Sequence, residues 1–483
     1  MTGRGLLVLS LPGFFALAST ACRTNYDGGD QNEESGASGD TDAGDAETSM
    51  DAGPDSGTSD SSSSSSSGDG DDTSSGDGDS SSDDTSSGDG DAGSGGDGDT
   101  GSVPECGDGQ HEPGELCFLA YGEHDLAHDL ESIDARDMTG DGRPDVVGVL
   151  ATSDQVLSIV NQGDGTFANG SPHTAAAGTQ NYDIVVMELD QDAAGHPDIL
   201  FANNGFSQAT MVSGDGSGDL AAQEYASDYW YMGPMRTFEV VDLNGDDFED
   251  VLSGVGSGAM IASLGQAGGG LTHPLDPNEV PDHAGCGAAD IIPARMGAAG
   301  LTPFLVCEDL GEVHEWRVQG SMSNDVFLQD TYSVGMAPTG GDHCDLDGNN
   351  YDDIVVSVSG EDEVAILFFD VNGMMSAAQL DVGSSPQAVR CVDMNNDGHE
   401  DIVTVNDGGL GEETVTILLG EGDGGFQLSP VTLELNMANP RDPRDMEVQD
   451  FNGDGSPDIV IAFAYHNETQ QQEPALGVIL SNP

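Results

Sequence analysis

The chain has 483 residues, of which 89 are acidic and 10 are basic, so its formal net charge is −79. All the basic residues are arginine, and the absence of lysine excludes a P-loop lysine and Schiff-base chemistry. A chain this acidic repels phosphate backbones and anionic bilayer surfaces, which excludes nucleic acid as a partner.

Residues 1–21 have the pattern of an export signal peptide. Arg4 supplies a positive charge, an apolar stretch follows, and small residues lead up to Cys22. This arrangement resembles the lipobox of bacterial lipoproteins, with Ser19 where leucine is usual. We therefore expect lipidation of Cys22 and a place on the outer membrane or cell surface, with the lipid as the only membrane attachment. Ordinary cleavage would instead leave a secreted protein.

Residues 22–103 form a low-complexity segment of Asp, Ser and Gly. Beyond Arg23 this segment holds 22 acidic and no basic residues. It cannot bury enough apolar surface to offset its ordering entropy, so we expect a disordered acidic linker. The next residues, 104–117, form a short loop bounded by cysteines that is similar to segments beside spacers in myxobacterial surface proteins.

Six cysteines remain after Cys22, and an exported chain favours disulfides between them. The sequence alone does not fix their pairing. We predict the pairs Cys106–Cys117, Cys286–Cys307 and Cys344–Cys391, because Cys344 and Cys391 stand just before acidic loops of successive repeats. The alternative is a Cys/His metal cluster, although no C-x-x-C pair is present.

From residue 118 to residue 483 the chain is repetitive. A nine-residue acidic loop recurs five times, and an apolar, β-branched run follows each copy. The copies are residues 137–145, 242–250, 345–353, 393–401 and 450–458. Two degenerate copies fill the wide gaps, one at 190–198 and one that starts at Met296 and has lost every acid. The repeat therefore has seven units.

Each unit contains short runs typical of β-strands, bounded by Gly, Asp and Asn. Residues 238–242 lead into a loop, 353–358 follow one, and 415–419 form a third strand before a glycine turn. A weaker fourth run completes the unit. We predict an all-β fold, a seven-bladed β-propeller with calcium-binding loops. The last unit ends after its third strand, so we expect residues 115–120 to supply the fourth and close the ring.

The acidic loops carry oxygen side chains at positions 1, 3, 5 and 9. Calcium takes about six to eight hard oxygen ligands, and a backbone carbonyl at position 7 would add one. Asp, Asn and Gly also favour plain turns, but five copies in register favour about five calcium sites. Zinc and copper would instead prefer His or Cys side chains as ligands. The predicted ligands, with position 7 acting through its carbonyl, are Asp137, Thr139, Asp141, Arg143, Asp145, Asp190, Asp192, Asp198, Asp242, Asn244, Asp246, Phe248, Asp250, Asp345, Asp347, Asn349, Tyr351, Asp353, Asp393, Asn395, Asp397, His399, Asp401, Asp450, Asn452, Asp454, Ser456 and Asp458.

These repeats resemble the FG-GAP and VCBS repeats of bacterial surface proteins and of the integrin α-subunit propeller. The resemblance covers about residues 118–483 and rests on the core Asp-x-Asn-Gly-Asp-Gly-x-x-Asp-Ile-Val. It implies that the calcium sites lie between the first and second strands of a blade and are mainly structural. It also implies that ligands bind the opposite face.

Tyr229, Trp230 and Tyr231 lead into the third unit, on that expected ligand face. Aromatic side chains with polar tips suit sugar stacking or a protein contact, and equally suit packing between blades. No H-E-x-x-H or G-x-S-x-G motif is present. We predict a calcium-stabilised binding or adhesion module at the cell surface that recognises carbohydrate or an extracellular protein. The alternatives are a polysaccharide-degrading lyase or glycosidase with an unmarked carboxylate pair, and a structural domain without a ligand.

Overall fold

The computed structural model describes residues 114, 116–126, 129–150, 155–174, 181–189, 195–203, 208–218, 220–226, 235–256, 258–271, 285–297, 300–318, 326–409, 411–435, 441–464 and 475–482. All of them belong to the unit that spans Gly96–Pro483. The regular elements among these residues are β-strands, without an α-helix. The described part of the chain therefore contains no helix long and apolar enough to cross a membrane.

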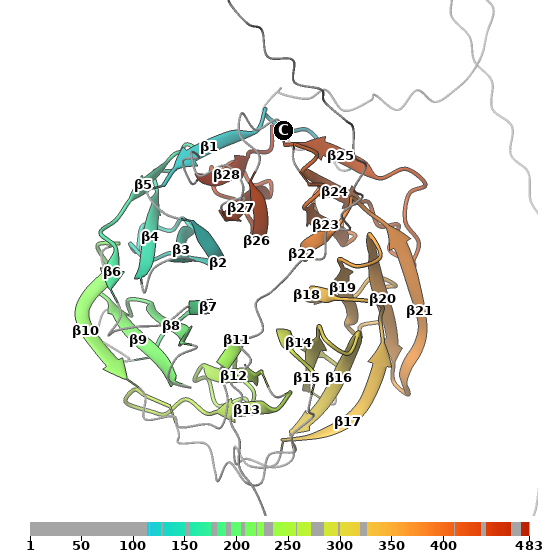
Figure 1. The fold of residues 1–483 in the computed structure, drawn as a ribbon, viewed down its shortest axis with the longest axis horizontal. Coiled ribbons are helices and arrows are strands. Elements are labelled where there is room, and N and C mark those ends of the chain that lie inside the picture. Colours follow the sequence, from blue (N-terminus) through green and yellow to red (C-terminus); the bar gives the residue numbers. More distant parts are fainter. Residues whose placement is uncertain are drawn as a thin grey trace, which may run out of the picture. The chain divides into compact units, whose positions relative to one another are not determined.

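Seven antiparallel sheets surround one axis as the blades of a propeller (Figure 1). Blade 1 contains β2 (Leu130–Arg136), β3 (Asp145–Leu150), β4 (Gln155–Asn161) and β5 (Phe167–Asn169), with β6 (His173–Thr174) also on β4. Blade 2 contains β7 (Asn181–Met187), β8 (Asp198–Asn203), β9 (Gln208–Gly214) and β10 (Leu220–Ala226). The described part of blade 3 contains β11 (Met235–Val241), β12 (Asp250–Val255) and β13 (Met260–Ser263).

The other four blades each have four strands. Blade 4 contains β14 (Ala288–Arg295), β15 (Leu301–Cys307), β16 (Glu312–Val318) and β17 (Val326–Ser333). Blade 5 contains β18 (Pro338–Cys344), β19 (Asp353–Val358), β20 (Glu363–Asp370) and β21 (Gly373–Asp381). Blade 6 contains β22 (Pro386–Val392), β23 (Asp401–Asn406), β24 (Thr414–Leu418) and β25 (Val431–Glu434). Blade 7 contains β26 (Asp442–Gln449), β27 (Asp458–Ala464), β28 (Ala475–Ile479) and β1 (Gly122–Asp125). The predicted seven-bladed propeller is confirmed.

The second strand of a blade is buried on both faces. Every residue of β3, β12, β19, β23 and β27 is buried. Side chains alternate along a strand, so neighbours serve opposite blades. Val146 packs in one cluster with Val460 of blade 7, whereas Val147 packs in another with Ile199 of blade 2. This double burial explains why the run after each loop is continuously apolar instead of alternating.

The two ends of the repeat region close the ring within blade 7. Strand β1 pairs antiparallel with β28, so the blade combines the start and the end of the repeat region. The predicted pairing of the ends is confirmed, but residues 115–120 do not form the strand itself. They lie beside the C-terminal end, where Phe118 forms a bridge with Ser481 and the N–H of Leu119 donates to the carbonyl of Leu480, while Leu116 and Phe118 pack against the core. The strand itself is formed a few residues later.

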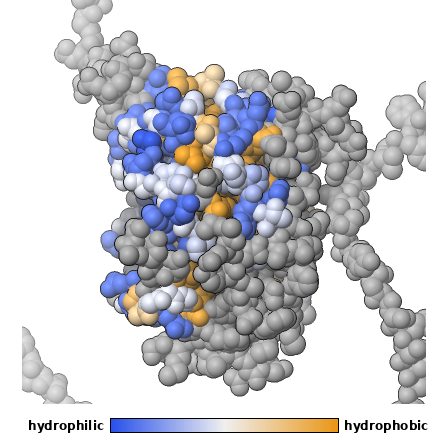
Figure 2. Space-filling view, turned by 90° about the vertical axis from the view of Figure 1, so that its left-hand side faces the viewer, coloured by the Kyte–Doolittle hydropathy of each residue, from blue (hydrophilic) through white to orange (hydrophobic). Residues whose placement is uncertain are grey.

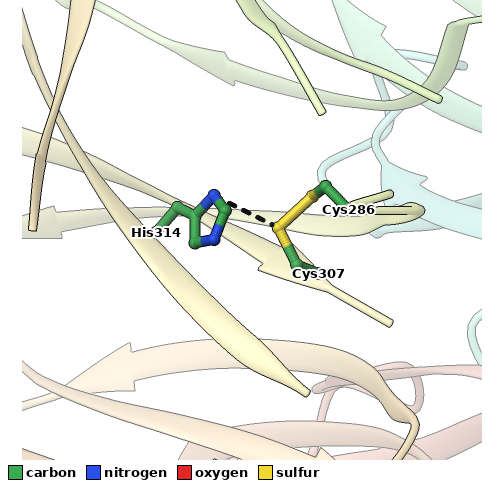
Figure 3. Close-up of side chains that lie close together, drawn as sticks. All are labelled: Cys286, Cys307 and His314. Atoms are coloured by element: carbon green, nitrogen blue, oxygen red, sulfur yellow. Dashed lines mark hydrogen bonds between the residues drawn. A yellow bond between two sulfur atoms is a disulfide. The ribbon is translucent and has the colours of Figure 1, made fainter. Parts of the chain in front are cut away.

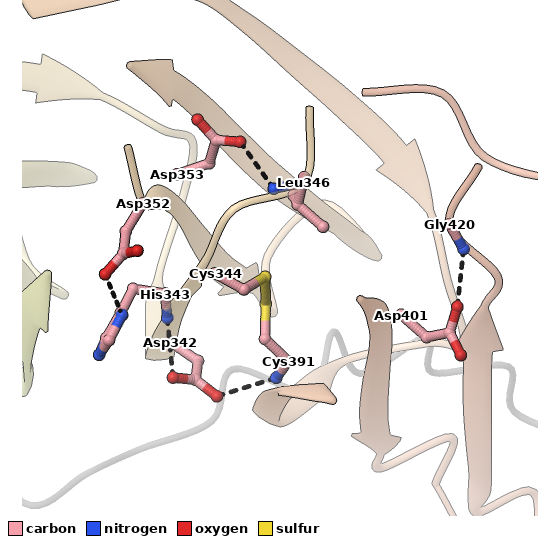
Figure 4. The surroundings of a disulfide bond; sticks show 9 residues. All are labelled: Asp342, His343, Cys344, Leu346, Asp352, Asp353, Cys391, Asp401 and Gly420. Atoms are coloured by element: carbon pink, nitrogen blue, oxygen red, sulfur yellow. Dashed lines mark hydrogen bonds and ion pairs between the residues drawn. A yellow bond between two sulfur atoms is a disulfide. The ribbon is translucent and has the colours of Figure 1, made fainter. Parts of the chain in front are cut away.

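Two predicted disulfides are present. Cys286–Cys307 lies within blade 4, with its Cα atoms 4.5 Å apart. Cys344–Cys391 joins β18 of blade 5 to β22 of blade 6, with its Cα atoms 6.0 Å apart (Figure 4). Cys117 is also disulfide-bonded, and its predicted partner Cys106 lies outside the described residues. The Cys344–Cys391 bond therefore fastens two neighbouring blades covalently.

The outer surface is more polar than the core. On the side of the propeller shown in Figure 2, the described residues are mostly hydrophilic, with small hydrophobic spots between them. The outermost strand of blade 5, β21, exposes most of its side chains, including Met374 and Met375.

Candidate metal centre

The acidic loops occupy the same place in every blade that has one. Each connects the first strand of a blade to the second, as the repeat resemblance implied. Because the strands of a blade are antiparallel, all these loops lie on one face, together with the turns between third and fourth strands. The turns between second and third strands and the links between blades lie on the opposite face.

The backbone of the loop turns tightly at two positions. The backbone φ is positive at position 6 of all five loops, which is Gly142, Asp247, Asn350, Gly398 and Gly455. The backbone φ is also positive at position 4 of all five loops, which is Gly140, Gly245, Gly348, Asn396 and Gly453. Glycine and asparagine tolerate this left-handed conformation best, which explains their recurrence there.

The aspartate at position 1 organises the loop around its carboxylate. In blade 1, Asp137 Oδ1 accepts the backbone N–H of Gly140 at 2.7 Å, and Oδ2 accepts that of Gly142 at 2.7 Å. The equivalent bond to the N–H of position 6 recurs in the other four loops, at 2.7 to 3.0 Å. A carboxylate has about four lone-pair sites, so these bonds leave room for a cation on the same oxygens.

The residue at position 5 accepts the N–H of position 7. The carboxylates of Asp141, Asp246, Asp397 and Asp454 do so, and the amide oxygen of Asn349 takes that role in blade 5. In blade 1 the side chain of Arg143 also pairs with Asp141. The carbonyl of position 7 as a calcium ligand stays a prediction.

The aspartate at position 9 is buried and fastens the loop to the rest of the blade. Asp401 is fully buried, its Oδ2 accepts the N–H of Met394 at 3.0 Å, and its Oδ1 accepts that of Gly420, beyond the third strand, at 2.8 Å (Figure 4). The same two bonds recur in six blades, through Asp145, Asp198, Asp250, Asp353, Asp401 and Asp458. Position 9 thus has a structural role, whether or not it also contacts a metal.

Blade 5 gathers three carboxylates closely. Single oxygens of Asp345, Asp347 and Asp353 lie within 4.8 Å of one another. Burial, together with the charges of Asp347 and Asp345, raises the pKa of Asp353 to about 7. Crowded carboxylates that are partly or fully buried repel one another, and a divalent cation with a preference for hard oxygens offsets that repulsion. The carboxylate oxygens of this loop fit calcium as ligands and do not fit zinc or copper, which prefer nitrogen or sulfur ligands.

Several predicted site residues lie outside the described part of the chain. They are Cys22, Cys106, Asp190, Asp192, Tyr229, Trp230 and Tyr231. Within blade 2 only Asp198 of the predicted ligands is described, and it makes the position 9 bonds. The degenerate loop of blade 4 is a shorter turn, because Arg295 pairs directly with Leu301.

Sequence reasoning missed a second set of charged residues, on the innermost strands. We call it the axial ring: Asp134, Asp183, Glu239, Asp290, Asp342, Arg390, Asp445 and Glu447. Five of its aspartates accept a backbone N–H from the innermost strand of the next blade: Asp134 from Val186, Asp183 from Phe238, Asp290 from Gly341, Asp342 from Cys391 and Asp445 from Ile133. At the junction of blades 6 and 7, Arg390 pairs with Asp445 and Glu447 instead. These contacts hold neighbouring blades together.

Glu239 breaks this pattern at the junction of blades 3 and 4. Within the described residues its carboxylate accepts no hydrogen bond, and it faces Asp290, Asp134 and Asp183. Burial and then these acids raise the pKa of Glu239 well above its usual value. The glutamate therefore weakens the folded state at neutral pH, where burial and its acidic neighbours both oppose its charge.

Replacing Glu239 with glutamine is expected to raise the thermal midpoint by a few degrees at pH 8. A raised pKa means that the folded state binds this proton more tightly than the unfolded chain does. Folding then loses stability as the pH rises from the ordinary glutamate pKa through the raised one. The gain from E239Q should therefore shrink as the pH falls towards about 4. E412Q, at an exposed glutamate, is the matched control, and a lower midpoint for E239Q at pH 8 would contradict the expectation.

The comparisons with known proteins agree with the repeat and the fold. The FG-GAP-like repeat family matches residues 137–194, 345–404 and 393–461, three segments that begin at acidic loops. No curated protein matches the sequence. Among solved structures, a chain from the crystal structure of BBS1N in complex with ARL6DN, soaked with lead, has a TM-score of 0.50 at 12% identity, over 76% of this chain and 97% of that chain. A functionally unknown protein from Desulfotomaculum acetoxidans has a TM-score of 0.44 at 10% identity, over 69% of this chain and 98% of that chain. At 12% identity the likeness to the BBS1N–ARL6DN complex concerns the fold alone.

Proposed function

Starting from a seven-bladed β-propeller that carries FG-GAP-like repeats, we propose a calcium-stabilised binding or adhesion module at the cell surface. The observation that carries the proposal is the blade 5 loop, where oxygens of three aspartates lie within 4.8 Å of one another. The same loop pattern recurs on one face in five blades, so calcium has a supporting role there. Hard-oxygen sites of this kind suit an extracellular module, where free calcium is plentiful.

The ligand would be a carbohydrate or an extracellular protein, bound on the face opposite the loops. That face carries the turns between second and third strands and the links between blades. Leu310, in the β15–β16 turn, and Met336, in the link from β17 to β18, are exposed there. Tyr229, Trp230 and Tyr231 belong to the link between β10 and β11, and we retain them as proposed contact residues.

Attachment to the surface would come from the N-terminal part of the chain. A lipid on Cys22 would anchor the protein, and the acidic segment of residues 22–103 would act as a spacer that lifts the propeller off the membrane. The mass of the full chain after expression in a bacterium with a lipoprotein pathway tests this. A mass without acyl chains would remove the anchor and leave a secreted protein.

The binding function is tested with a glycan array and a reducing-end release assay on the same preparation. We expect binding to at least one glycan or surface protein without sugar release, and weaker binding in a calcium chelator. W230A tests the proposed contact, with W316A avoided because Trp316 is fully buried in the core. Release of reducing ends that stops when one carboxylate on the ligand face is neutralised would contradict the proposal and favour a lyase or glycosidase.

A further inference from the structure

A disulfide in blade 4 is packed against a histidine. Cys286 and Cys307 are fully buried, His314 is 2% exposed, and the three side chains lie side by side (Figure 3). His314 Nδ1 is 3.4 Å from Cys307 Sγ. Nδ1 and the two sulfur atoms all lie within 4.8 Å of one another.

The sheet holds this cluster in place. Cys307 of β15 pairs with Glu312 of β16, and Leu305 pairs with His314. Residues two apart on a strand share a face, so Cys307, Glu312 and His314 all project from the same side of the blade. Two of the three cluster residues, Cys307 and His314, therefore lie on hydrogen-bonded strands, and Cys286 lies two residues before β14 begins.

Glu312 orients the histidine towards the sulfur atoms. Its Oε2 lies 3.1 Å from His314 Nε2. A carboxylate at Nε2 favours the tautomer with the proton there, which leaves the lone pair of Nδ1 directed at the cysteines. A carboxylate behind an imidazole is also the usual support of a metal-bound histidine.

We propose that, when the disulfide is reduced, Cys286, Cys307 and His314 bind one zinc ion. A two-electron reductant opens the S–S bond to two thiols: a dithiol supplies two electrons and two protons and becomes a cyclic disulfide, and a phosphine takes the oxygen of a water molecule, whose protons go to the thiols, and becomes a phosphine oxide. Zinc then replaces the two thiol protons, which leave to solvent. This site is independent of the proposed binding function and of the calcium loops.

The geometry and the ligand types both favour zinc. With a Zn–S distance of about 2.3 Å and a Zn–N distance of about 2.0 Å, sulfur and nitrogen on a tetrahedral zinc lie roughly 3.5 Å apart. The observed distance between His314 Nδ1 and Cys307 Sγ is 3.4 Å. Zinc binding would therefore leave His314 in its position while the two sulfur atoms separate. Two thiolates and an imidazole are soft ligands that select zinc over calcium, the opposite of the all-oxygen loops. A fourth position remains for water.

The test compares zinc content in the oxidised and reduced full chain. The protein is reduced with a phosphine without oxygen, kept in excess calcium to fill the acidic loops, incubated with zinc chloride, and passed over gel filtration with a weak chelator. We expect about one additional zinc per chain in the reduced protein, measured by elemental analysis. C286S/C307S should lose this ion, and C344S/C391S, which lacks the other fully described disulfide, should retain it.

E312Q keeps the test decisive if the cysteine variants fail to fold. The Glu312 side chain is 33% exposed, so this substitution should leave the fold intact and the disulfide formed in the oxidised chain, as judged by free thiols. We expect its zinc affinity to fall roughly ten- to a hundredfold. The proposal would be overturned by equal zinc content in both redox states, by unchanged zinc content in C286S/C307S, or by wild-type affinity in E312Q.

Discussion

Removal of calcium is expected to lower the thermal midpoint of the propeller by roughly 20 °C or more. One site that binds only the folded state contributes about 2.7 kcal/mol when calcium is at about a hundred times its dissociation constant. Five such loops would together contribute on the order of 10 kcal/mol. For a domain of a few hundred residues, each kcal/mol corresponds to about 2–4 °C. Thermal melts in calcium and in excess chelator measure this difference.

The physical reason is the charge that each loop concentrates. In the blade 5 loop, Asp353 is fully buried between neighbouring blades, and Asp345 and Asp347 lie next to it. Without a cation these carboxylates repel one another, and the pKa of Asp353 is raised first by burial and then by the charges of Asp347 and Asp345. A second reading, in which hydrogen bonds alone hold the loop, predicts the same midpoint in chelator as in calcium.

D347N is the matched variant for a single site. Asp347 Oδ1 accepts the N–H of Asn349 at 3.1 Å, a bond that asparagine retains, so the substitution removes charge while it keeps the turn. We expect one fewer calcium per chain by elemental analysis and about one-fifth of the total loss in stability. Magnesium should not replace calcium, because it demands a tighter, near-octahedral shell. An unchanged midpoint in chelator, with no calcium found in the protein, would overturn the calcium assignment.

The number of blades and the place of the loops could be predicted because they repeat. The spacing of the five good loops, from Asp137 to Asp450, sets the period, and the two degenerate copies complete it. Closure of the ring was predictable as well, because a missing fourth strand leaves an open edge. The residues that form the closing strand were not predictable, because the apolar residue Phe118 suits a strand and a core position equally.

The axial ring could not be predicted from the sequence. Asp134 and Asp342 each precede an acidic loop by three residues, so they look like extensions of it. Their role appears only when the blades are placed side by side, since each accepts an N–H from the next blade. Position 9 was ambiguous for the same reason. The sequence does not distinguish a buried aspartate that accepts two backbone N–H groups from an aspartate that binds calcium.

Asp198 separates these two roles, because it keeps position 9 in a loop that has lost the oxygen at position 5. D198N is expected to destabilise the protein by about 2–4 kcal/mol. Asp198 is 2% exposed and accepts the N–H of Leu189 at 2.9 Å and that of Gly214 at 3.1 Å. Asparagine offers one oxygen and one N–H donor, so one buried backbone N–H loses its acceptor and a charged acceptor is lost.

The decisive measurement is whether the effect of D198N depends on calcium. If Asp198 serves only to fasten the loop to β9, urea unfolding should give the same difference between D198N and the wild type in calcium and in chelator. D215N is the matched control, because Asp215 lies in an exposed turn of the same blade and asparagine retains its bond to Ser217. Its effect should stay within about 0.5 kcal/mol. A D198N effect that shrinks in chelator would contradict a purely structural role, since only a metal ligand loses part of its contribution when the metal is removed. Equal effects would mean that the position 9 aspartate holds blade 2 together without calcium, and that the metal stabilises only those loops that kept their full set of oxygens.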